Sequence, residues 1–109
     1  AKILRGEIPC TKVFEDDHTL AFEDIEPQAR VHVLVIPKGP YVSMTDFVEQ
    51  ASDAEMAALN RAVLKVVEAK DLKKRGYRVL SNVGEEGGQL VPHLHIHVFG
   101  GQPLGPMLG

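Results

Sequence analysis

Three histidines at every second position carry the clearest chemical signal in this sequence. They are His93, His95 and His97, and apolar residues fill the gaps at positions 94, 96 and 98. Residues at i, i+2 and i+4 of a β-strand share one face, so the three imidazoles would point the same way. A chain with only five histidines rarely places three in register by chance. The pattern therefore predicts a strand over 93–99 with one apolar face and one reactive face.

Metal binding is the first chemistry to consider, because histidine is the commonest zinc ligand. Alternate residues of a strand are about 6.6 Å apart, so His93 and His97 would be separated by about 13 Å. Zinc holds imidazole nitrogens at about 2 Å, so one ion could take two neighbours of the row but hardly all three. A third ligand would have to come from elsewhere, with His32 as the obvious candidate. We expect no metal and no other cofactor, and a metal-binding module stays open as an alternative.

Nucleophilic and acid–base chemistry suits the row of imidazoles better. A neutral imidazole is a good nucleophile near pH 7, its conjugate acid donates protons, and neighbouring rings can divide these roles. Attack on phosphorus fits histidine, because water can cleave the resulting phospho-imidazole. The glycine-rich segment 84–89 precedes the row and could direct backbone N–H groups at an anion, although a plain hairpin loop is an equal alternative. Asn82 and Gln89 would add side-chain donors.

The row must be positioned by a sheet, which the remaining sequence predicts. Short strands over 11–16 and 18–23 form a hairpin around Asp16-Asp17. The most apolar run, 31–36, indicates a central strand buried on both faces. His32 lies inside this run and needs a hydrogen-bonding partner or a ligand. A strand over 77–83 would form a hairpin with the histidine strand.

Helices complete the expected fold. A capping box at 52–55 opens the only long helix, over about 53–70, and residues 2–8 form a short N-terminal helical turn. A further helical turn is expected around 45–48. The predicted class is α+β, with a five-stranded antiparallel sheet, one long helix and a short N-terminal helix.

Composition limits the kind of partner. The 109 residues suit a single domain over 1–109, with 44% hydrophobic and 25% charged residues. A net charge of −3 argues against a nucleic-acid-binding domain but allows a local phosphate site. The single cysteine, Cys10, is expected to be a packing residue rather than a nucleophile, and the lack of a disulfide framework fits a cytoplasmic protein. No apolar run is long enough for a membrane span, so no membrane partner is expected.

The segment from His93 to Phe99 resembles the His-φ-His-φ-His-φ-φ signature of the histidine triad (HIT) superfamily. The resemblance covers nearly the whole chain and is closest to the Hint branch of small nucleotide-binding phosphoramidases. It also rests on Gly6-Glu7-Ile8-Pro9, Leu34-Val35-Ile36-Pro37-Lys38, Gly87-Gly88-Gln89 and the bacterial-type ending Pro103–Leu108.

The resemblance implies an adenosine 5′-monophosphoramidase-like hydrolase of purine nucleoside phosphoramidates and acyl or aminoacyl adenylates. AMP would be released through a nucleotidyl-histidine, without a metal, by a homodimer in which two five-stranded sheets join. By motif position, His95 would attack the α-phosphorus and His97 would contact the phosphate and assist proton transfer. His93 would orient His95, partly through its backbone carbonyl, and His32 would support the row.

The nucleotide contacts that the resemblance implies lie outside the triad. Asp24 would hold the ribose hydroxyls, and the base pocket would be lined by Ile3, Phe22, Ile25 and Leu34. Asn82, Gly88 and Gln89 would face the ribose-phosphate and the leaving group. Leu90 departs from the family, which often has serine or threonine there, so one hydrogen bond toward the leaving group would be lost. A dinucleoside polyphosphate hydrolase and a non-catalytic nucleotide-binding or metal-binding module remain the alternatives.

Overall fold

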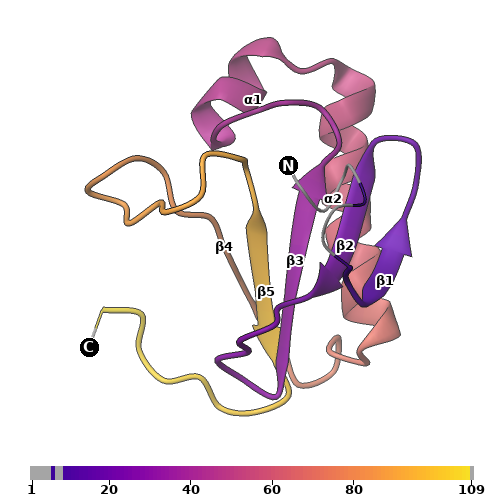
Figure 1. Ribbon diagram of the computed structural model, residues 1–109. Helices are drawn as coiled ribbons and strands as arrows, with labels where there is room; N and C mark the ends of the chain where they lie inside the picture. Colours follow the sequence, from indigo (N-terminus) through magenta and orange to yellow (C-terminus); the bar gives the residue numbers. More distant parts are fainter. Residues whose placement is uncertain (1–5, 7–8, 109) are drawn as a thin grey trace.

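The computed structural model describes residue 6 and residues 9–108, and these form one antiparallel sheet with two helices (Figure 1). The elements are β1 Lys12–Glu15, β2 Thr19–Glu23, β3 Val31–Pro37, α1 Met44–Gln50, α2 Asp53–Ala69, β4 Arg78–Leu80 and β5 Ile96–Gly100. The five strands lie in the order β1-β2-β3-β5-β4. The predicted α+β class and five-stranded sheet are confirmed. The expected N-terminal helix over 2–8 lies outside the described residues, apart from Gly6.

Strand β3 occupies the centre of the sheet, as its apolar sequence predicts. It pairs with β2 from Val33 opposite Glu23 to Pro37 opposite Thr19, and with β5 from Val31 opposite Gly100 to Val35 opposite Ile96. Val33 and Val35 are fully buried in the core that includes α2. The alternate positions, beginning with the almost fully buried His32, face the other side of the sheet.

Helix α2 covers one face of the sheet and leaves the other face for the site (Figure 1). It begins with the predicted capping box, in which the Ser52 side chain accepts from the Glu55 backbone and the Glu55 side chain accepts from the Ser52 backbone. Its apolar stripe, including Leu59 and Val66, packs on the sheet. None of the helices that the described residues form has both the length and the apolar character needed to cross a bilayer.

Two predicted elements have different bounds in the structure. The turn expected around 45–48 is the full helix α1, because Ser43 caps it by accepting from the backbone N–H of Asp46. The strand expected over 77–83 is shorter, since β4 ends at Leu80. Beyond it the Asn82 side chain donates to the backbone of Gly87, and such local bonds compete with a strand ladder.

The strand predicted over 93–99 begins only at Ile96, so His97 alone of the three histidines lies on a strand. The ladder with β3 starts at the pair Val35 and Ile96. Before that point the chain leaves β3, and the backbone N–H of Leu94 donates to the carbonyl of Tyr41 instead (2.8 Å). The expected strand boundary was therefore wrong by three residues.

Candidate active site

The three histidines of the row nevertheless reach one cavity, of about 340 Å³, on the sheet face opposite α2. The side chains still alternate between the two sides of the segment before the strand, because Leu94, Ile96 and Val98 are all buried in the core and the histidines between them face the other way. Three bonds hold the segment that precedes β5. They are the Leu94–Tyr41 backbone bond, a bond from the Ser81 hydroxyl to the His95 carbonyl (3.1 Å), and one between the His93 ring and the Pro37 carbonyl (2.9 Å).

Four of the predicted nucleotide contacts line the same cavity: Phe22, Asp24, Ile25 and Leu34. Phe22 is buried beside Leu34, whereas the Ile25 side chain is 86% exposed at the rim. One carboxylate oxygen of Asp24 accepts from the backbone N–H of Glu26 (2.8 Å). Ile3 lies outside the described residues.

Four further residues line the cavity although the sequence did not predict them there: Pro9, Cys10, Ile36 and Val91. Strand periodicity could have found Ile36, which shares a face of β3 with His32 and Leu34. Val91 stands two positions before His93 and continues the alternation. Cys10 was expected to pack, and it does contact the apolar cluster at this cavity while remaining partly exposed.

The ring of His95 has a defined tautomer. Its Nδ1 lies 2.8 Å from the carbonyl oxygen of His93, and a carbonyl can only accept a hydrogen bond. The proton of the neutral ring is therefore on Nδ1, and the Nε2 lone pair is free. By the same reasoning the His93 ring donates through Nε2 to the carbonyl of Pro37. The neutral ring of His95 thus has the tautomer that a nucleophile needs, with its orientation fixed by the His93 backbone.

The ring of His97 has the opposite tautomer, set by a chain of hydrogen bonds that begins at Gln28. The Gln28 backbone N–H donates to Nδ1 of His32 (3.2 Å), so the proton of neutral His32 is on Nε2. This Nε2–H donates to Nδ1 of His97 (2.9 Å), with an Asp24 carboxylate oxygen as a second acceptor at 3.4 Å. The proton of neutral His97 is therefore on Nε2. The row combines a bare Nε2 on His95 with an Nε2–H on His97.

Burial keeps the rings of His32 and His97 neutral. The pKa of His97 is lowered to about 4, first by burial and then by the neighbouring rings of His95 and His32, while the charge of Asp24 opposes the shift. Burial also lowers the pKa of His32, again against the charge of Asp24. His97 is thus a neutral hydrogen-bond donor at neutral pH.

One group of described residues brings possible metal ligands together, namely Asp24, His32 and His97, whose ligand atoms lie within 4.8 Å of one another. Two nitrogens bound to one tetrahedral zinc are about 3.3 Å apart, further than the 2.9 Å that separates the His32 and His97 nitrogens. Metal binding at Nε2 of His32 would also move its proton to Nδ1, where the Gln28 N–H already donates. The donor set therefore fits a proton-ordered pair better than a metal.

The glycine-rich loop does not contribute to the lining of this cavity. Asn82 donates to the carbonyl of Gly87 (2.8 Å), and the N–H groups of Gly88 and Gln89 donate to carbonyls within the loop. The Gln89 side chain bonds Gly84 N–H and the carbonyls of Val42 and Val91. These groups hold the loop and the backbone of Val91, and they are not directed at an anion. Leu90 is 92% exposed beside them.

Known proteins are similar to this chain over nearly its whole length. A family model described as the HIT domain matches residues 5–104. An HIT-like protein of Azospirillum brasilense is 60% identical over 108 residues, which cover 99% of this chain and 88% of that protein. The purine nucleoside phosphoramidase of Escherichia coli K12 is 40% identical over 108 residues, covering 99% of this chain and 90% of that protein.

Solved structures show the same likeness. A HIT family hydrolase from Legionella pneumophila superposes with a TM-score of 0.86 at 40% identity, covering 99% of this chain and 96% of that one. A histidine triad protein from Clostridium difficile superposes with a TM-score of 0.84 at 42% identity, covering 96% and 90%.

Proposed function

The chain belongs to the HIT domain family, and we propose that it is a nucleotide-binding hydrolase. Its substrates are purine nucleoside phosphoramidates and acyl or aminoacyl adenylates, from which it releases AMP. One observation carries the proposal: complementary tautomers place a free Nε2 on His95 and an Nε2–H on His97, with ring centroids 5.0 Å apart in one cavity. The relative from Escherichia coli supports the substrate class, because its name is purine nucleoside phosphoramidase.

In the first step, the Nε2 lone pair of His95 attacks the α-phosphorus and forms a nucleotidyl-histidine. The bond from phosphorus to the leaving group breaks, and its electron pair goes to the leaving atom. The carboxylate that leaves an acyl adenylate needs no proton. The nitrogen that leaves a phosphoramidate takes one, and the Nε2–H of His97 is the donor in the cavity. The nucleotidyl-His95 ring is then positively charged, and in the phosphoramidate reaction this charge stabilises the His97 imidazolate beside it.

In the second step, water attacks the nucleotidyl phosphorus and the bond to His95 breaks, with its electron pair returning to Nε2. After a phosphoramidate has reacted, the proton of the water goes to Nε2 of His97, which restores the resting tautomer. After an acyl adenylate has reacted, His97 still holds its proton, and the proton of the water goes to solvent. The His93 carbonyl keeps His95 in place through both steps. His32 acts as a positioning residue, because it reaches the substrate only through His97.

The nucleoside occupies the apolar part of the cavity. Phe22, Leu34 and Ile36 form one wall for the base, and Ile25 closes over it from the rim. Asp24 lies among them with a carboxylate oxygen near His32, where it can accept from ribose hydroxyls. Gln89 acts as a positioning residue that holds the Val91 wall beside the leaving group, and Asn82 and Gly88 support it by bonds within the loop.

The test is the His95→Ala variant, assayed for AMP release from adenosine phosphoramidate. We expect turnover to fall by about 10³-fold or more, because the nucleophile is lost. His18→Ala, an exposed histidine in the β1–β2 turn, is the matched control and should keep wild-type turnover. Wild-type-like turnover by His95→Ala would refute the assignment.

The same assay separates the alternatives. Faster cleavage of a diadenosine polyphosphate than of the phosphoramidate would favour the polyphosphate hydrolase. Clear AMP binding without any turnover by the wild-type protein would favour a non-catalytic module. Activity that is unchanged by a chelator is expected, and loss of activity on chelation would favour a metal site at Asp24, His32 and His97.

We also propose that two copies pair through the edge strand β4. Val79 is 44% exposed, although its cross-strand partner Val98 is fully buried, and the neighbouring Tyr77 is 45% exposed. An open edge with apolar side chains is a surface that proteins usually cover. Light scattering should give the mass of a dimer for the wild type and of a monomer for Val79→Lys. Val48→Lys, at an exposed valine of α1, is the control and should remain a dimer. A monomeric wild type contradicts the pairing.

A further inference from the structure

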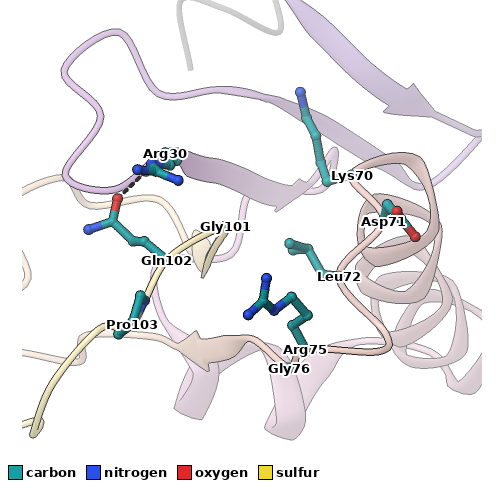
Figure 2. Close-up of a pocket in the computed structure, with 9 residues that line it drawn as sticks. All are labelled: Arg30, Lys70, Asp71, Leu72, Arg75, Gly76, Gly101, Gln102 and Pro103. Carbon is teal, nitrogen blue, oxygen red and sulfur yellow. Dashed lines mark hydrogen bonds between the residues drawn. The ribbon is translucent and has the colours of Figure 1, made fainter.

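Figure 2 shows a second cavity, of about 520 Å³. Its lining residues Arg30 and Gly101 flank the start of β3 and the end of β5, so it lies at the other end of these strands from His93 and His95. Arg30, which immediately precedes β3, forms one side, and the connection from α2 to β4 forms another. The segment after β5 completes it with Gly101, Gln102 and Pro103. Leu72 belongs to the core on the α2 side of the sheet, so this cavity is separate from the proposed active site.

Positive charge is concentrated in this cavity, in a chain whose net charge is −3. Arg30, Lys70 and Arg75 line it, with Asp71 as the single lining carboxylate. Lys70 is already paired with Glu23 at 3.0 Å. Within the part of the chain that the structure describes, Arg30 and Arg75 form no ion pair with a carboxylate. Two guanidinium groups are therefore available to a ligand.

The frame around these arginines is fixed. The Gln102 side chain accepts from the backbone N–H of Arg30 (2.8 Å), which ties the segment after β5 to the start of β3. Gly101 has a positive φ of 79°, and a Cβ there would lie 3.1 Å from the Cβ of Arg30. Figure 2 shows the Arg75 guanidinium directed toward the space between Leu72 and Gly101, whereas the Lys70 amine extends away from it.

We propose that this cavity binds a phosphate monoester through Arg30 and Arg75. The planar guanidinium fork matches the spacing of phosphate oxygens, and two forks suit a doubly charged group better than a single carboxylate. A cavity of about 520 Å³ is larger than a bare phosphate needs and is in the range of small-molecule sites. Pro103, which is exposed, provides an apolar surface for the organic part of the ester.

The test is a titration followed by the amide NMR signals of Gly76 and Gly101, which report on this cavity, and of His97, which reports on the active site. Ribose 5-phosphate should give saturable shifts at both glycines of the wild type. Arg75→Gln and Arg30→Gln should each weaken these shifts by about 10- to 100-fold in affinity, because each removes a charge-assisted bond, and should leave shifts at His97 unchanged. Arg61→Gln, at an exposed arginine of α2, is the matched control and should bind as the wild type.

The outcomes distinguish the ligand sources. Inorganic phosphate should bind at this cavity more weakly than ribose 5-phosphate, because it lacks an organic part to contact Pro103. Equal affinity for the two would overturn the monoester and identify an inorganic phosphate site. No saturable shift at Gly76 and Gly101 in the wild type, or equal shifts in Arg75→Gln, would overturn the site itself.

Discussion

Replacing His97 by glutamine should remove a large part of the acid sensitivity of the fold. The pKa of His97 is lowered to about 4 from an ordinary value of 6.5, chiefly by burial. The unfolded chain therefore binds a proton between about pH 6.5 and pH 4 that the folded chain does not bind. Protons then favour unfolding, so the stability present above pH 6.5 is lost as the pH falls through this window. A shift of about 2.5 pH units at about 1.36 kcal/mol each corresponds to roughly 3 kcal/mol.

The assay is urea denaturation of the wild type and of His97→Gln at several pH values between 7 and 4.5. The free energy of unfolding of the wild type should fall more steeply, and the difference between the two proteins should change by about 2–3 kcal/mol over this range. His18→Gln removes an exposed histidine from the β1–β2 turn and should follow the wild-type curve. Parallel curves for the wild type and His97→Gln, within about 0.5 kcal/mol, would refute the buried neutral His97 on which the proposed proton donor depends.

Two further predictions concern Gly87 and Leu90, in the loop before the histidines. Gly87→Ala should destabilise the protein by about 1–3 kcal/mol in urea denaturation, because the added Cβ would lie 2.2 Å from the carbonyl oxygen of Val83. Glu86→Ala is the control and should have near-wild-type stability. Equal stability of the two variants would show that the backbone can relax at position 87. Leu90→Thr should leave stability within about 0.5 kcal/mol, because Leu90 is 92% exposed. It should also raise kcat/KM for a phosphoramidate relative to an acyl adenylate by up to about tenfold, since a hydroxyl can donate toward a leaving nitrogen, and an unchanged ratio would exclude this contact.

The face of the segment that carries the histidines was predictable, because side chains alternate between two faces along any extended backbone. Alternation predicted that Leu94, Ile96 and Val98 are buried while the histidines between them face a common side, and the structure confirms this burial pattern. The pattern requires only an extended backbone, so it survived although the segment before Ile96 is not a strand.

The boundaries were less predictable because they depend on partners far away in the sequence. Leu94 bonds to Tyr41, some fifty positions earlier, and no local signal at Leu94 shows this. Helix α1 did carry a local signal, since Ser43 precedes Asp46 by three residues as in a capping box, but the short apolar pattern after it indicated only a turn. The role expected for the glycine loop was the weakest inference, because glycine content does not reveal which N–H groups are already bonded within the loop.

The Gln28 backbone N–H has a consequence for how this protein tolerates mutation. It sets the direction of the hydrogen bonds through His32 to His97, yet it belongs to the main chain and not to a side chain. Nineteen of the twenty amino acids supply the same group, so most substitutions at position 28 preserve the order of the protons, and proline alone removes the donor. A position can therefore be functionally essential while its residue identity varies freely, and a sequence comparison would reveal it only as a site where proline is missing.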